Sequence, residues 1–361
     1  MADVEITKNE NDLEAKDLFQ IVDSVETSKN DDSKNIRRNI LFSALPIINL
    51  MLWYWANGMY GIAVQNYAGK VMTNQVSGTS KDVTKDFLHT MTITSFLTCS
   101  QMFLGALIGR VVLYGLNKQI TWSEISSTHW LPISLLHGFG SQATNMGFMY
   151  GKASVIQVIK LLEPFETLFL SKYFFQEGSP FSSGTIGSMV VVVGSAMSLL
   201  KLQTTPPVPQ AVILALMSGL MFSCRNVLQR KHHSTNQFSM EWAPIEKSVI
   251  QFTQISYYSG LWTGSLSIVL IMLVPGCKFH APSLQVLVWH PLYNIFSMMM
   301  LGLCSALTHS LLNAVKRVFS IVMAMMYFSE GFDSRTLTSL FLVGVGGSWY
   351  SWERKKSKST S

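Results

Sequence analysis

The chain has 361 residues, of which 48% are hydrophobic and only 13% are charged, about half of the roughly 25% charged share of soluble domains. The net charge is +6, yet basic residues flank apolar runs, as at Arg37, Arg38 and Arg354–Lys358. Cations in such positions favour one side of a bilayer. The composition therefore argues against a soluble globular protein, and it indicates a lipid bilayer and no nucleic acid as partner.

The segment 1–36 is predicted to be a disordered acidic tail. Met1 to Lys34 contains ten acidic residues and four lysines, and its few large apolar side chains bury too little surface to offset the entropy of ordering. No apolar core follows a basic start, and a transit peptide would be poor in acids. We therefore expect neither a signal peptide nor a transit peptide.

Ten apolar runs of a length that crosses hydrocarbon follow this tail, since a membrane helix needs about 20 residues. The runs are continuous and do not alternate, which argues against a strand barrel. The predicted fold is an all-α membrane protein with ten transmembrane helices. The expected spans lie near Ile40–Ile62, Phe87–Tyr114, Trp130–Tyr150, Ser154–Phe175, Ser182–Leu200, Val208–Leu228, Phe252–Val274, Val286–Cys304, Ala306–Phe328 and Ser334–Trp352.

The proline-rich segment Thr204–Pro209 divides these runs five and five. A duplicated half with an odd number of spans enters the membrane in the opposite direction, which produces an inverted repeat. We therefore predict a first half at 37–203, a second half at 204–352, and a basic tail at 353–361. The excess of Lys and Arg on the side of both termini places the two ends in the cytosol.

No motif for catalysis or metal binding is legible. Cys99, Cys224, Cys277 and Cys304 show no paired spacing for zinc or redox chemistry. No histidine pair suited to a metalloenzyme and no phosphate-cradling P-loop is present. We expect no enzymatic activity, no metal and no cofactor.

Three cations interrupt the apolar runs: Lys160 in the fourth, and the adjacent Lys316 and Arg317 in the ninth. A charge at the centre of a membrane helix costs roughly 2.5–3.5 kcal/mol, so such residues usually face a wet cavity. Arg offers a planar fork of donors and Lys a point charge, a combination that suits a doubly charged phosphate. These residues predict an anion pocket.

Simpler interpretations stay open for Lys160 and for a fourth cation, Arg225. Lys160 lies within helical reach of Glu163 and Glu166 and could be neutralised by either. Arg225, near the end of a run, could extend to the interface or line the cavity. The Lys316–Arg317 pair has no acid in its own span until Glu330, so we expect it to be uncompensated.

Four stretches resemble the plastidic triose-phosphate and phosphate translocator family of the drug/metabolite transporter superfamily. They contain the patterns IKxxEPF and THSxxNxxKRV, and they lie at Val158–Phe165, Ser223–Leu228, Tyr293–Asn294 and Leu307–Val318. The resemblance implies ten helices and exchange of inorganic phosphate for an organic phosphate by alternating access.

The resemblance also implies the roles of individual residues. The lysines and Arg317 would bind the phosphate group, and Tyr293 would donate a hydrogen bond to it. Thr144 takes the place of a threonine that contacts the rest of the substrate, and Ser141, one turn earlier, falls where the family tends to carry histidine or asparagine. The full predicted substrate site is Lys160, Lys316, Arg317, Tyr293, Thr144, Arg225 and Ser141.

The expected function is a membrane antiporter that exchanges triose phosphate or a related sugar phosphate for inorganic phosphate. The alternative is a nucleotide-sugar transporter of the Golgi or endoplasmic reticulum, which would also need cations for a diphosphate. The expected location is correspondingly an organelle membrane, either an outer membrane of the plastid envelope or one of those compartments. Glycines in the runs favour helix packing within one chain, so a monomer or weak dimer is expected.

Overall fold

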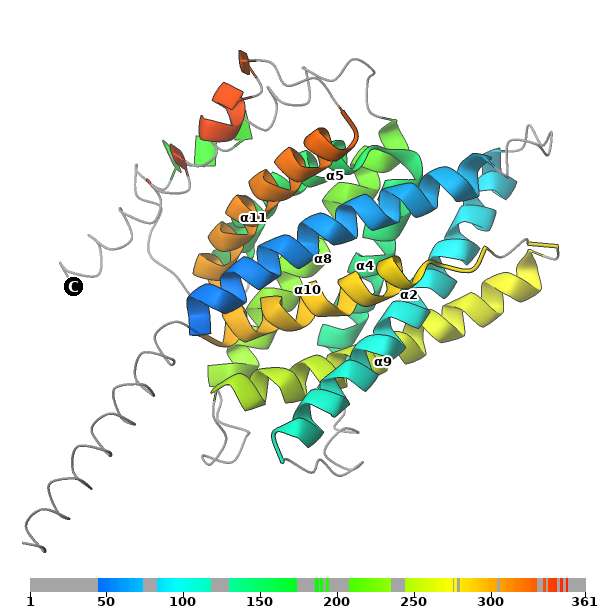
Figure 1. The fold of residues 1–361 in the computed structure, drawn as a ribbon, viewed down its shortest axis with the longest axis horizontal. Coiled ribbons are helices and arrows are strands. Elements are labelled where there is room, and N and C mark those ends of the chain that lie inside the picture. Colours follow the sequence, from blue (N-terminus) through cyan, green and yellow to red (C-terminus); the bar gives the residue numbers. More distant parts are fainter. Residues whose placement is uncertain are drawn as a thin grey trace, which may run out of the picture. The chain divides into compact units, whose positions relative to one another are not determined.

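The computed structural model describes residues 45–73, 83–117, 130–173, 208–234, 244–303 and 306–329, with short gaps, together with parts of 186–194 and 334–349 (Figure 1). Within these residues every regular element is helical. The chain divides into two units, Met1–Leu50 and Met51–Ser361, and all contacts described below lie within the second.

The helices follow the predicted apolar runs. After a helix at residues 45–73 come α2 (Val83–Gly115), α4 (Leu131–Tyr150), α5 (Ala153–Ile159), the 3-10 turn η2 (Lys160–Leu162), α6 (Glu163–Tyr173), α8 (Pro209–Ser234), α9 (Pro244–Leu273), α10 (Leu284–Leu303) and α11 (Ala306–Tyr327). The predicted fifth and tenth spans lie largely outside the described residues, as do the tails at 1–36 and 353–361. Helical turns are nevertheless present within 186–194 and 334–349.

The first helix continues beyond the predicted end at Ile62 to residue 73. Gln65 and Asn66 interrupt the apolar run there, but the buried residues Val64, Ala68 and Val71 recur at helical spacing. One apolar face is therefore maintained through a segment whose average hydropathy is lower. This periodicity, and not an unbroken apolar run, accounts for the continuation of the helix past Ile62.

The predicted fourth span is not one continuous α-helix. The α-helix ends at Ile159, the chain forms a 3-10 turn at Lys160–Leu162, and the backbone N–H of Glu163 bonds to the carbonyl of Lys160. Pro164 has no N–H to donate to that carbonyl in α-helical register, because it lies four residues further on. The break therefore falls on Lys160.

The side chains show the arrangement expected in lipid, with polar groups inside and apolar groups outside. On α2, Thr98 and Gln101 are fully buried, while Leu107 and Val111 are 59% and 63% exposed. Among the described helices, four are long and apolar enough to cross a membrane: α2, α8, α9 and α10. Exposed apolar and buried polar side chains are the pattern of a membrane bundle.

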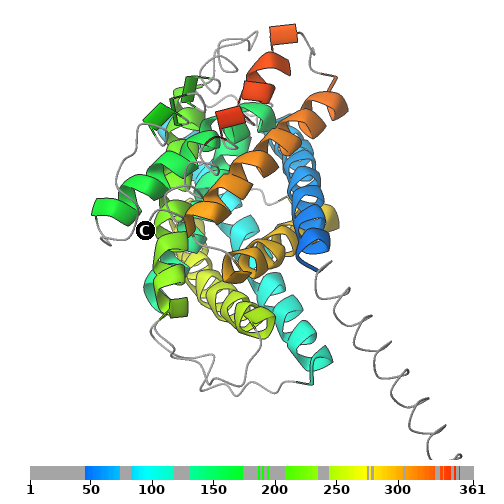
Figure 2. The same cartoon turned by 90° about the vertical axis from the view of Figure 1, so that its left-hand side faces the viewer.

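Helices distant in sequence pack closely around a polar interior. α2 runs along α9, α4 packs against α8, and α11 packs against α5 and α6 (Figures 1 and 2). The α2–α9 contact is close because Gly109 faces Thr253 and Phe252, leaving no room for a side chain. These contacts bring α4, α5, α8 and α11 to one region of the interior.

Candidate functional site

A polar cavity of about 40 Å³ lies among the helices. At about 10–15 Å³ per water molecule, it holds roughly three. It is lined by Asn57, Tyr60, Thr144, Gln157, Lys160, Glu163, Phe222, Arg225, Tyr293, Asn294, Ser297, Asn313, Lys316 and Arg317.

Six of the seven sequence-predicted site residues line this cavity. The exception is Ser141, which is buried on α4 but is not part of the lining. Its Oγ has no hydrogen-bond partner among the described residues. The structure thus brings the three intramembrane cations together with Tyr293, Thr144 and Arg225.

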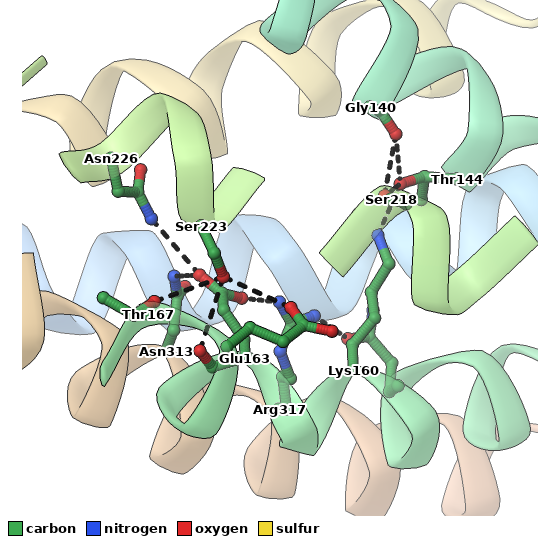
Figure 3. Close-up of polar contacts among 12 residues, drawn as sticks. Gly140, Thr144, Lys160, Glu163, Thr167, Ser218, Ser223, Asn226, Asn313 and Arg317 are labelled. Carbon is green, nitrogen blue, oxygen red and sulfur yellow. Dashed lines mark hydrogen bonds and ion pairs between the residues drawn. The ribbon is translucent and has the colours of Figure 1, made fainter. Parts of the chain in front are cut away.

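Lys160 points toward α4 and away from the acids on its own segment (Figure 3). Its Nζ donates a hydrogen bond to Thr144 Oγ1, which lies 2.6 Å from Ser218 Oγ on α8. Both hydroxyls also donate to the carbonyl of Gly140, at 2.9 and 2.8 Å. Since the break at Lys160 redirects the chain, this ammonium bonds to the Thr144 hydroxyl and, within the described residues, forms no ion pair with Glu163 or Glu166.

Arg317 was expected to lack a carboxylate partner, and the structure corrects that expectation. Its Nη2 forms an ion pair with Glu163 Oε2, and its Nη1 donates to Gln157 Oε1 at 3.1 Å (Figure 3). Asn313 Nδ2 donates to the second Glu163 oxygen at 2.7 Å, as does Asn226 Nδ2 at 3.3 Å. The carboxylate that pairs with Arg317 thus comes from a different segment of the chain. Inspection of the span that contains Arg317 cannot identify it.

Lys316 is the least neutralised cation of the site. Its Nζ lies 4.7 Å from the ring centre of Trp53 and 5.6 Å from that of Tyr293. Within the part of the chain that the structure describes, it makes no hydrogen bond and no ion pair. Aromatic faces attract a cation without removing its charge, so this ammonium remains available to an anion.

Arg225 lines the cavity, which decides between the two interpretations left open above. Its Nη1 lies 2.8 Å from His137 Nδ1, and its Nε and Nη2 donate to Asn226 Oδ1 at 3.1 and 2.5 Å. The guanidinium also lies over the ring of Phe222, with Cζ 5.1 Å from the ring centre. It does not extend to an interface, because the side chain is fully enclosed.

The lining therefore carries four cationic side chains and one carboxylate. An unpaired charge in a poorly solvated interior is costly, and Arg317 also keeps a buried Nε without a partner in the described structure. A compact anion with two negative charges would satisfy these groups.

Several lining residues were not predicted from the sequence: Tyr60, Gln157, Phe222 and Ser297. Gln157, Phe222 and Ser297 each lie three or four positions from a residue that the sequence had singled out: Lys160, Arg225 and Tyr293, respectively. Residues at that spacing share one face of a helix. Helical spacing from the cationic and motif residues would therefore have found these three, but not Tyr60.

Residues 48–351 match the Triose-phosphate Transporter family. The chain belongs to that family. As a Triose-phosphate Transporter family member it is a transporter and not an enzyme, and it is a multi-pass membrane protein.

Relatives of this transporter include plastid phosphate translocators. It is 27% identical to the chloroplastic phosphoenolpyruvate/phosphate translocator 1 of Oryza sativa subsp. japonica, over 69% of this chain and 61% of that protein. Identity to the chloroplastic triose phosphate/phosphate translocator of Zea mays is 26%, over 62% and 55% of the two chains. The matched region thus spans only about three fifths of these relatives' length.

A protein of known crystal structure superposes on this transporter with a TM-score of 0.54. The match covers 83% of this chain and 96% of that protein, at 13% sequence identity. At that identity the likeness concerns the fold alone.

Proposed function

We propose that this transporter is an antiporter that exchanges an organic phosphate, a triose phosphate or a related sugar phosphate, for inorganic phosphate by alternating access. The observation that carries the proposal is the cation excess of one buried cavity, whose lining sets Lys160, Arg225, Lys316 and Arg317 against the single carboxylate of Glu163. The names of the plastid relatives, which are phosphate translocators, support the same class of substrate.

In this proposal the phosphate group binds between Lys316 and Arg317. Lys316 contributes an ammonium that makes only aromatic contacts, and Arg317 contributes its unpartnered Nε. Lys160 and Tyr293, whose ring lies beside the Lys316 ammonium, would donate to the remaining oxygens, while Thr144 and Arg225 would face the organic part. The cavity has to widen on binding, because its present volume of about 40 Å³ holds only a few water molecules.

Exchange, in place of free uniport, follows from the charge balance. Cations in a poorly solvated cavity repel one another, and a bound dianion relieves that repulsion. The loaded carrier should therefore change between its two open forms more readily than the empty one, since a ligand favours the states it binds best. Each inward passage of an anion is then followed by an outward passage.

We also propose that the chain has ten spans arranged as two inverted halves, 37–203 and 204–352, that it works as a monomer or weak dimer, and that it resides in an organelle membrane of plastid or endomembrane origin. An inverted repeat would bring its two halves together at a substrate site near the midplane. Lys160 of the first half lines the same cavity as Lys316 and Arg317 of the second half, which supports this arrangement.

The test is phosphate exchange in proteoliposomes containing the full chain. Vesicles preloaded with inorganic phosphate, triose phosphate, phosphoenolpyruvate or a nucleotide sugar are given labelled phosphate outside. We expect uptake with preloaded phosphates, and Lys316→Ala should abolish it while Lys231→Ala, at the exposed end of α8, retains it. Full activity of Lys316→Ala contradicts the proposed site, and uptake only with nucleotide sugars would replace the proposed substrate.

A further inference from the structure

Glu163 and Glu166 lie one helical turn apart on α6 but have contrasting surroundings. Glu163 is fully buried and accepts hydrogen bonds from Arg317, Asn313 and Asn226. A carboxylate held by a guanidinium and two amides is stabilised in its ionised form. The binding mechanism proposed above uses Glu163 and leaves Glu166 without a role.

Glu166 lies in a largely apolar groove of about 620 Å³. The rest of the lining carries no charged side chain and includes Leu162, Phe165, Leu168, Met189 and Val190. Among the described residues its carboxyl group accepts one hydrogen bond, from Ser223 Oγ to Oε2 at 3.2 Å, and it forms no ion pair. An ionised carboxylate is costly in such surroundings, whereas a protonated one is not.

The position of this carboxyl group is defined by the facing helix. Both of its oxygens lie over Gly219 of α8, where an added Cβ would be 2.9 Å from Oε2 and 3.1 Å from Oε1. Ser223, one turn further along α8, supplies the hydrogen bond. The absence of a side chain at Gly219 and the hydroxyl at Ser223 thus hold the group against α8.

The charged and titratable groups that face Glu166 come from three other elements and its own helix. They are Glu163 on α6, Lys160 on η2, Arg317 on α11 and Cys224 on α8. The described residues of 186–194 that line the groove carry no titratable side chain. Glu166 is therefore subject to the field of two of the cavity-lining cations, Lys160 and Arg317, although it is not in the cavity lining itself.

We propose that Glu166 is a proton-binding site coupled to anion binding, so that the carrier takes up a proton when its phosphate arrives and releases it when the phosphate leaves. In the empty carrier, Lys160 and Arg317 attract a negative charge at Glu166. A bound phosphate cancels that attraction and adds repulsion between two anions, which favours the neutral carboxyl group. No covalent step is involved, and the proton comes from water.

Linkage between two binding sites is reciprocal. If phosphate favours protonation of Glu166, protonation must strengthen phosphate binding by the same factor. Acidic conditions should therefore tighten binding in the wild type. Glu166→Gln, which resembles the protonated form, should bind phosphate tightly at all pH values. The inference rests on the proposed function because it takes phosphate as the anion.

The transport experiment measures the half-saturation concentration of phosphate–phosphate exchange in proteoliposomes with equal pH on both sides. Both proteins experience the same ionisation of phosphate, so their ratio isolates the side chain. We expect the wild-type value to equal that of Glu166→Gln at about pH 5.5 and to exceed it by about fivefold or more at about pH 8, a coupling of ordinary size. Glu166→Asp should restore the pH dependence, and Glu246→Gln, in the first turn of α9, should behave as wild type.

If the ratio of the wild-type and Glu166→Gln half-saturation concentrations stays constant across this pH range, the inference is overturned while phosphate exchange stays intact.

A second measurement does not depend on transport. Dicyclohexylcarbodiimide reacts with protonated carboxyl groups in apolar surroundings, and mass spectrometry of the full chain in liposomes locates the adduct. We expect labelling at Glu166 that declines as pH rises and that inorganic phosphate increases at a given pH, because bound phosphate favours the protonated carboxyl group, with Glu163 unlabelled throughout.

The two measurements separate the two proposals. If the wild type shows no phosphate exchange, the proposed function fails, and the labelling pattern still decides whether Glu166 binds a proton. Labelling at Glu163 in place of Glu166, or equal labelling of both, contradicts the assignment, because it would mean that the ion pair with Arg317 does not keep Glu163 ionised.

Discussion

The carboxylate of Glu163 on α6 is ion-paired with the guanidinium of Arg317 on α11, a residue 154 positions further along the chain. Both side chains are buried and line the same cavity. The pair therefore joins two distant segments at the place where we propose that phosphate binds. A phosphate that takes over part of the Arg317 interaction would loosen this connection.

Removing the carboxylate should destabilise the protein. Glu163→Gln leaves Arg317 buried without a counter-charge, and breaking a buried pair from one side costs about 3–5 kcal/mol. Thermal unfolding in detergent should show a clear loss of stability, partly recovered by phosphate because a ligand of the folded state stabilises it. Glu246→Gln is the matched control. If Glu163→Gln unfolds at the same midpoint as the wild type, the ion pair does not stabilise the protein.

Two hydroxyls on α4, one turn apart, should differ in importance. Thr144 lines the cavity and accepts a hydrogen bond from Lys160, whereas Ser141 lies outside the lining. Thr144→Ala removes the acceptor and should lower phosphate exchange by about tenfold, the equivalent of about 1.4 kcal/mol. Ser141→Ala should cost clearly less, and Thr144→Ser should retain most activity. The reverse order in the exchange assay would show that substrate passes on the Ser141 side.

The hydroxyl group of Tyr60 should contribute to the stability of the protein. It donates to Asn145 Oδ1, while Asn145 Nδ2 donates to Thr98 at 2.8 Å and to Gln101 at 3.0 Å. Tyr60→Phe keeps the ring but leaves a buried acceptor without a donor, which costs about 1–3 kcal/mol. The loss is measured by thermal unfolding in detergent. Tyr67→Phe is the comparison, because the Tyr67 hydroxyl donates to the backbone carbonyl of His280 at 2.8 Å in a less buried place. An equal effect of the two substitutions would argue against the buried network.

Two glycine-to-alanine substitutions should differ in their effect on the stability of the protein. A Cβ at Gly109 would overlap Thr253 Oγ1 and lie 3.2 Å from Phe252 Cδ1, so Gly109→Ala should separate α2 from α9 at a cost of about 1–3 kcal/mol. A Cβ at Gly61 would meet nothing within 4 Å, and Gly61→Ala should be neutral or stabilising by up to about 1 kcal/mol through helix propensity. Denaturation of the two variants side by side checks the sign. A stable Gly109→Ala variant would mean that the two helices do not approach as closely as described.

The sequence predicted most helices correctly where an apolar run is unbroken. It placed α2, α4, α10 and α11 close to their observed bounds, because lipid requires continuous apolar length, whereas α9 begins at Pro244, well before the predicted Phe252. It failed at the C-terminal side of the first helix, which continues past Ile62 on an amphipathic pattern, and at Lys160, where Pro164 redirects the backbone. One buried face extends the first helix, and backbone hydrogen bonding breaks the helix at Lys160. Average hydropathy is sensitive to neither.

The sequence allowed the cationic residues of the candidate site to be predicted, but not the groups that pair with them. A charged residue in an apolar run is conspicuous, and Lys160, Lys316 and Arg317 do line one cavity. Helical reach suggested Glu163 as the partner of Lys160, but that argument assumes an uninterrupted α-helix. The turn at Lys160–Leu162 breaks the assumption and leaves Glu163 facing α8 and α11.

The sequence by itself determined that this chain belongs in a membrane, that it carries buried cations, and that its motifs are those of a transporter family. These properties depend on composition and on spacing within single helices, where neighbours in sequence are neighbours in space. Only the tertiary structure decided which cation Glu163 neutralises, that Arg225 faces the interior, and that Glu166 lies beside an apolar groove. Such facts depend on how helices far apart in sequence pack together, because the environment of a buried charge is supplied by the facing helix and not by its own.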